Sequence, residues 1–117
     1  MTLQQIARRL ELNLLNPQVS FDASREVGRA HASDLLSDVL ANAPGGGLLL
    51  TIQVHLNVIA VAVHAGLAAV VFTSGLTPET EVLERAAAEG LPLFSTQEAT
   101  FDVAGKLYAL GLRGRNG

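Results

Sequence analysis

The chain of 117 residues is 49% hydrophobic but only 16% charged, and it contains no cysteine. This length fits one domain with its own core, and the missing cysteine excludes disulfides and thiolate metal sites. A net charge of −3 argues against binding of nucleic acid, for which a basic surface is the first requirement. We expect so apolar a small domain to cover part of its surface by self-association.

The N-terminal part of the chain predicts helices and short strands in alternation. Apolar residues at helical spacing predict a helix over residues 2–10, with Thr2 as its N-cap. Short strands are predicted over 12–15 and 26–32, on either side of a polar loop. A helix over 33–42 follows, with Ser33 or Asp34 as the N-cap and an apolar face made by positions 35, 36, 39 and 40.

A βαβ unit is predicted between Gly47 and Gly75. It consists of a buried strand at Leu48–Ile52, a polar elbow at Gln53–Asn57, an apolar helix that ends at Gly66, and a second buried strand at Ala68–Phe72. Such a unit normally joins two parallel strands by a right-handed crossover.

The C-terminal part predicts another helix, strand and helix. Thr77 is the predicted N-cap of a helix with Pro78 in its first turn, which ends at Gly90. A short strand at Leu91–Ser95 leads to an amphipathic helix at Thr100–Leu110. Its predicted inward residues are Phe101, Ala104, Leu107 and Tyr108. Residues 113–117 are predicted to be a disordered tail.

Together these elements predict a three-layer α/β domain over residues 1–112, with a mainly parallel sheet of four to five strands flanked by helices. The apolar stretch from Leu56 to Phe72 is interrupted by Asn57, His64 and Gly66, so we expect no membrane span. The N-terminus has helical spacing rather than the pattern of a targeting signal. We therefore expect a cytoplasmic protein.

Polar residues follow three of the predicted strands, where open α/β sheets bind ligands. The candidate ligand-binding residues are Gln53, His55, Asn57, Thr73, Ser74, Gly75, Ser95 and Thr96. An alternative is that His55 and Asn57 cap the following helix. Serine, threonine and glycine are also simply common in strand-to-helix loops.

No catalytic or metal-binding signature is evident. The triple glycine Gly45–Gly47 precedes a strand instead of opening a helix, and no lysine directly follows it, so it does not resemble a phosphate-binding loop. His31, His55 and His64 lie too far apart in sequence to predict a metal site. Asp34 and Asp38 have a spacing that could hold a cation, but Asp34 is more simply a cap or first-turn acid. No cofactor is expected.

The helix at 57–65 is apolar nearly all round, and one chain of this size cannot bury every side of an outer helix. Its candidate dimer-interface residues are Val58, Ile59, Val61 and Ala62. The alternative is that a terminal helix covers this surface.

Nearly the whole chain resembles the DRTGG domain family. The resemblance includes the N-terminal helix, Arg25-Glu26-Val27, the SDLLSDVLAN helix at 33–42, the TIQVHLN elbow at 51–57 and the closing FDVAGKLYALGL at 101–112. The resemblance implies a dimerising, regulatory α/β module, found alone or joined to CBS domains or phosphotransacetylase-like enzymes. It also implies similarity to the N-terminal domain of HPr kinase/phosphatase, but not to its catalytic domain. This chain departs from the family pattern at Gly28-Arg29-Ala30, where relatives often carry paired glycines.

The predicted function is that of a non-enzymatic, dimerising regulatory module, which senses a small nucleotide-like or anionic ligand and acts through a partner protein. One alternative is a small enzyme or phosphocarrier that uses His55. Another is an assembly scaffold without a ligand.

Overall fold

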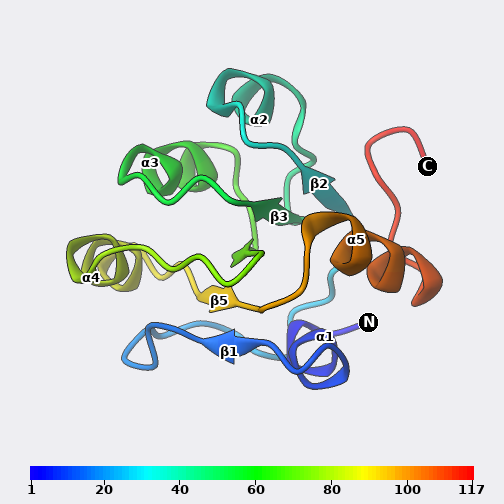
Figure 1. Ribbon diagram of the computed structural model, residues 1–117, viewed down its shortest axis with the longest axis horizontal. Helices are drawn as coiled ribbons and strands as arrows, with labels where there is room; N and C mark the ends of the chain where they lie inside the picture. The colour runs from blue at the N-terminus through cyan, green and yellow to red at the C-terminus, as the bar shows by residue number, and fades with distance from the viewer.

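The computed structural model describes all 117 residues as five helices around a five-stranded sheet (Figure 1). The helices are α1 (Leu3–Arg9), α2 (Leu36–Asn42), α3 (Asn57–His64), α4 (Thr80–Ala88) and α5 (Thr100–Ala109). The strands are β1 (Asn13–Leu14), β2 (Ala30–Ala32), β3 (Leu48–Thr51), β4 (Ala69–Phe72) and β5 (Leu93–Ser95). The predicted three-layer α/β class is confirmed.

The strand order is β1-β5-β4-β3-β2, and all neighbouring pairs are parallel except the antiparallel edge pair of β1 and β5. The predicted βαβ unit is β3–α3–β4, with Leu48 opposite Ala69 and Thr51 opposite Phe72. Asn16, which is fully buried, fastens the loop after β1 to the start of β5. Its side chain donates to the Leu91 carbonyl and accepts from the Leu93 amide.

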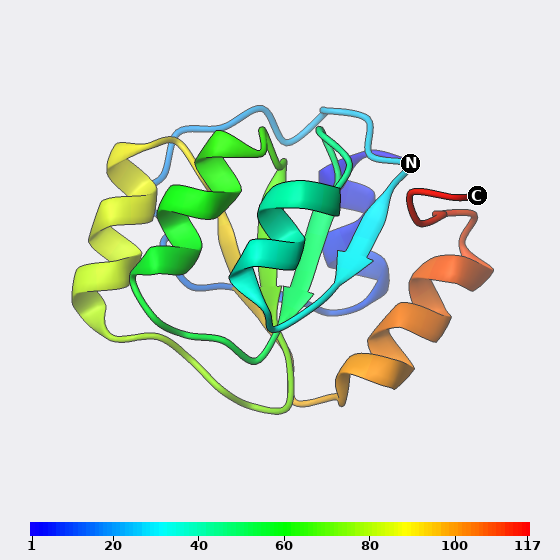
Figure 2. The same cartoon turned by 90° about the horizontal axis from the view of Figure 1, so that it is seen from above.

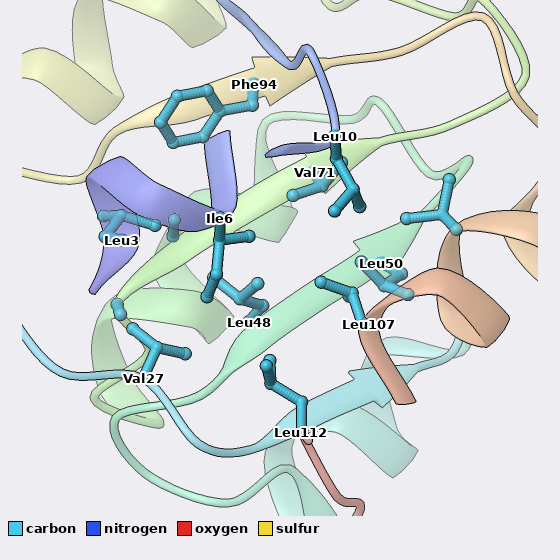
Figure 3. Close-up of a cluster of buried hydrophobic side chains, with 13 residues drawn as sticks. Leu3, Ile6, Leu10, Val27, Leu48, Leu50, Val71, Phe94, Leu107 and Leu112 are labelled. Carbon is cyan, nitrogen blue, oxygen red and sulfur yellow. The ribbon is translucent and has the colours of Figure 1, made fainter. Parts of the chain in front are cut away.

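Each face of the sheet carries its own hydrophobic core. Helices α1 and α5 cover one face, and α2, α3 and α4 cover the other (Figures 1 and 2). Side chains alternate along a strand, so Leu48 and Leu50 of β3 join the first core while Leu49 joins the second. Figure 3 shows Leu48 and Leu50 among side chains from α1 and α5, including Ile6 and Leu107.

Helix starts were predicted with mixed success. Thr2 is confirmed as the N-cap of α1: its hydroxyl accepts from the Gln5 amide, and the Gln5 side chain accepts from the Thr2 amide. The predicted caps of α2 and α4 are wrong. Leu35 precedes α2 and Glu79 precedes α4, neither with a side-chain cap. Asp34, expected to cap α2, accepts instead from Thr51 and Ile52. Thr77, expected to cap α4, lies two residues before the N-cap residue Glu79.

Two predicted apolar faces are only partly right, since Leu36 and Val39 of α2 and Ala104 and Leu107 of α5 do pack against the two cores. In α2 only Val39 is buried, while Leu35 and Leu40 face solvent. In α5 the buried residues are Val103 and Leu107, whereas Phe101 and Tyr108 are exposed. The cause is rotation: the helix turns Val103 and Leu107 toward the sheet, and Phe101 and Tyr108 lie on its far side.

The predicted dimer interface on α3 is wrong for most of its residues. Val58, Ile59 and Ala62 are buried in the chain's own second core, and Val61 packs against that core while partly buried. Helix α3 lies between α2 and α4 (Figure 1), so neighbouring helices cover its flanks. Homodimerisation itself stays a prediction.

The C-terminal residues lie along the outer edge of β2. Arg113 forms a parallel bridge with Arg29, and its guanidinium lies 3.9 Å from the centre of the Tyr108 ring. Arg115 donates to the Asn42 side chain. The disorder predicted for residues 113–117 stays a prediction. No helix of the fold has the length and apolarity that a membrane span requires, and the cytoplasmic location stays a prediction.

Candidate functional site

The carboxyl ends of β3, β4 and β5 lie together at one edge of the sheet (Figure 2), as the sequence predicted. The polar residues that follow these strands do not form one crevice, however. Those after β4 are bonded internally, and they separate two open depressions on opposite faces of the sheet edge.

The segment after β4 is held by its neighbours. Thr73 is buried, its amide donates to the Thr51 carbonyl, and its hydroxyl is hydrogen-bonded to that of Thr100 (2.5 Å). Ser74, with φ of 60°, donates its amide to the Glu98 carbonyl (2.8 Å), and Gly75 donates to the Thr96 carbonyl. Thr73, Ser74 and Gly75 therefore position the two flanking loops, and none of them lines either depression.

The first depression lies between the starts of α3 and α4; we call it the α3–α4 recess. It is lined by Gln53, Val54, His55, Leu56, Thr77, Glu79, Glu81 and Val82, with a volume of about 610 Å³. Its two glutamates make it acidic at neutral pH, because no lysine or arginine lines it.

The capping interpretation holds for His55 but not for Asn57, and the N-cap residue of α3 is Leu56. His55 Nδ1 accepts from the Asn57 amide (3.1 Å), and the Gln53 side-chain oxygen accepts from the His55 amide (3.2 Å). These two acceptors satisfy free amides before and at the start of α3. Asn57 takes part through its backbone amide rather than as a side-chain cap, and it does not line the recess.

The second depression lies beside the end of β5, between α1 and α5; we call it the β5 groove. It is lined by Arg9, Leu10, Glu11, Asn13, Ser95, Thr96, Gln97, Glu98 and Lys106, with a volume of about 650 Å³. Leu10 is its one hydrophobic lining residue. The predicted residues Ser95 and Thr96 lie here, away from Gln53 and His55.

Lys106 and Glu98 form an ion pair inside the β5 groove, with 2.5 Å between Nζ and Oε1. The hydrogen bond to Glu98 raises the pKa of Lys106 above its usual value. The Glu98 amide in turn donates to the Thr96 hydroxyl (3.2 Å). The loop after β5 thus contributes the Thr96 hydroxyl to the groove, and its Glu98 holds the Lys106 ammonium group of α5 there.

The sequence reasoning missed Arg9, Asn13 and Lys106. They come from the end of α1, the edge strand β1 and the middle of α5, and only the packing of these elements beside β5 brings them together. The sequence offered one indication of Lys106, because it is the only lysine of the chain.

The two aspartates expected as a possible cation pair have separate partners. Asp34 precedes α2 and accepts from the Thr51 hydroxyl and the Ile52 amide, both at 2.8 Å. Asp38 lies on α2 and accepts from Asn42 (2.7 Å) and from His31 Nε2 (2.8 Å). No three histidine, aspartate or glutamate side chains are grouped to hold a metal ion.

The hydrogen bonds from Asn42 and His31 lower the pKa of Asp38 to about 2. His31, expected at the surface, is a mostly buried side chain, 13% exposed. This pair joins the edge strand β2 to α2, and it lies outside both depressions.

The sequence pattern of the DRTGG domain matches residues 39–110, which is more than half of the chain. The chain belongs to the DRTGG domain family. The match extends from α2 to the end of α5, so it includes the elbow after β3 and Lys106, but not Arg9 or Asn13. No curated protein matches this DRTGG domain in sequence.

A solved structure has the same fold: the CBS and DRTGG domains of the regulatory region of Clostridium perfringens pyrophosphatase, complexed with its activator diadenosine tetraphosphate. The TM-score is 0.69 at 14% sequence identity. The aligned part covers 91% of the present chain but 45% of that structure. The likeness therefore concerns the fold of one part of that regulatory region.

Proposed function

We propose that this DRTGG domain is a non-enzymatic regulatory module, which binds a small anionic, nucleotide-like ligand in the β5 groove, self-associates and acts through a partner protein. The observation that carries the proposal is the lining of the groove. Arg9 and Lys106 lie in one depression with the polar side chains of Asn13, Ser95 and Thr96. Cations with neighbouring hydroxyl and amide groups match the oxygens of a phosphate.

Charge favours the β5 groove over the α3–α4 recess. The groove contains two cations and two carboxylates, Glu11 and Glu98, and one of these carboxylates already pairs with Lys106. The recess contains Glu79 and Glu81 with no arginine or lysine. An anion would meet uncompensated repulsion in the recess. Both volumes lie within the range of about 300–1,000 Å³ typical of ligand sites, so size does not separate them.

The family and its solved relative support a regulatory role. The Clostridium perfringens structure is a regulatory region, and it contains a nucleotide activator. By that analogy, this domain would transmit ligand binding to another protein or domain rather than catalyse a reaction.

The geometry around His55 supports a non-enzymatic role. A phosphoacceptor or general-base histidine needs a free ring nitrogen and a carboxylate that orients the ring. His55 Nδ1 accepts from the Asn57 amide, so Nε2 is the one ring nitrogen left for a reaction, and no carboxylate is hydrogen-bonded to His55 to orient its ring. The one histidine–carboxylate pair is His31 with Asp38, which lies outside both depressions.

Titration calorimetry with ATP and with inorganic pyrophosphate tests the proposal. Arg9→Ala and Lys106→Ala should each weaken binding by about tenfold or more, since a charged hydrogen bond contributes roughly 1.5–3 kcal/mol. Arg8→Ala is the matched control, because Arg8 belongs to the same helical turn but does not line the groove. Equal affinities for all three variants, or no binding of either probe to the unmodified protein, would contradict the proposal and favour a scaffold without a ligand.

A further inference from the structure

The outward face of α5 carries the most exposed aromatic side chains of the fold. Phe101 is 86% exposed, and Tyr108 is 59% exposed although the Arg113 guanidinium lies over one side of its ring. They are seven residues apart, which places them on the same face two turns from each other. The remaining exposed large apolar residues are spread over other segments: Leu35, Leu40, Ile52, Val63 and Leu76.

Gly105 lies between these two aromatic residues, in the interior of α5. Glycine destabilises a helix interior relative to alanine. A Cβ atom at this position would meet no other atom within 4 Å, so packing within the chain does not require a glycine. An exposed helical glycine between two aromatic side chains suits the close approach of another backbone.

We propose that this face pairs with the same face of a second copy, with the two α5 helices antiparallel about a two-fold axis between Ala104 and Gly105. In this arrangement Phe101 of one copy lies opposite Tyr108 of the other, and Gly105 lies opposite Ala104. The sequence is self-complementary about this axis, as a two-fold interface requires. Two aromatic pairs then flank a close backbone contact.

The charges beside this face are complementary about the same axis. Asp102 and Lys106 are both exposed and occupy the same flank of α5. Lys106 already pairs with Glu98 of its own chain. In the antiparallel pair, Asp102 of each copy also lies near Lys106 of the other, which adds two attractive contacts at the rim. In a parallel two-fold pair the Asp102–Lys106 flanks of the two copies would lie on opposite sides of the contact, so only the antiparallel arrangement brings these opposite charges together.

The proposed interface adjoins the β5 groove, because Lys106 lines the groove and also borders the exposed face of α5. A ligand held by Lys106 would therefore bind beside the contact between two copies. This inference rests on the self-association in the proposed function, and it names the surface responsible.

Sedimentation velocity of the full chain tests the interface. The unmodified protein should be a dimer, and Phe101→Glu should weaken it by at least about tenfold, because a charge would replace one aromatic ring in each of the two aromatic pairs. Val63→Glu is the control: Val63 is 40% exposed on the outward side of α3, so this variant should remain dimeric. A monomeric unmodified protein, or a dimer that persists in Phe101→Glu, overturns the proposal.

Single-cysteine cross-linking gives an independent test, since the chain has no cysteine of its own. Oxidation should link Gly105→Cys into a covalent dimer, because the two copies approach closely there. Ala60→Cys, on the exposed side of α3, should stay monomeric on a denaturing gel. Cross-linking through position 60 instead of 105 would overturn the proposal.

The two proposals fail separately. Binding of ATP or pyrophosphate to the Phe101→Glu monomer reports on the groove without the interface. A dimer that binds neither probe contradicts only the proposed ligand binding. An unmodified protein that is monomeric but binds a probe contradicts only the proposed interface.

Discussion

Helices α3 and α5 are both rich in apolar residues, yet they use them in opposite ways. Val58, Ile59 and Ala62 of α3 are buried, while Phe101 and Tyr108 of α5 face solvent. Helix α3 lies between α2 and α4, whereas α5 packs mainly on the sheet at β2 and β3 (Figure 1). Apolar composition therefore does not identify the free face of a helix. The neighbouring elements decide which face is free.

The largest expected effect is at the buried side of α3. Ile59 is 1% exposed, so Ile59→Ala should lower the free energy of unfolding by about 2–5 kcal/mol through lost burial and a cavity. Phe101→Ala, measured by urea denaturation at concentrations where the chain is monomeric, should change it by no more than about 0.5 kcal/mol. Similar losses of stability in the two variants would contradict the conclusion that the apolar residues of α3 are buried while Phe101 of α5 is free.

A smaller effect is expected when the glycine of α5 is replaced. In the Phe101→Glu background, Gly105→Ala should raise the free energy of unfolding by up to about 1 kcal/mol, because alanine favours helix and its Cβ meets no neighbour. The matched control is Gly66→Ala at the end of α3. That position is equally open, but its φ of 69° strains an alanine, so stability should fall. Urea denaturation of both variants measures the difference, and a loss in Gly105→Ala would show that α5 needs this glycine within one chain.

The smallest effect is expected at Asp38, whose side chain is one-third exposed and therefore partly screened by water. Its pKa is lowered to about 2 from the usual 3.8, so the unfolded chain takes up the proton first as pH falls. The stabilisation is complete above about pH 4 and is lost between about pH 4 and pH 2. Asp38→Asn should flatten the pH dependence of stability in this window.

Chemical denaturation at several pH values from 2 to 5 measures this difference. Glu84→Gln, on the exposed side of α4, is a control that removes a carboxylate without a hydrogen-bond partner in the structure. An equal flattening in both variants would show that general charge repulsion, and not the contacts of Asp38, controls acid stability.

Much of the fold was predictable because it depends on short-range patterns. Largely apolar runs at Leu48–Ile52 and Ala68–Phe72 predicted the buried parallel strands that became β3 and β4, and Gly66 predicted the end of α3. The position of the strand-end loops followed from this topology. The separation of these loops into two depressions could not be predicted, because it depends on hydrogen bonds between neighbouring loops, such as that between Ser74 and Glu98.

By itself, the sequence determined the order and type of the elements, the three-layer class, the family and the edge of the sheet where polar loops gather. The family followed from the resemblance of whole segments to the DRTGG domain. The other features follow from residue periodicity and turn chemistry, which act over a few neighbouring positions. Only the tertiary structure decided that Arg9 and Lys106 share a groove, that Ile59 is buried and that Phe101 is exposed. Those outcomes depend on which elements pack beside each helix, and such contacts join residues far apart in the chain.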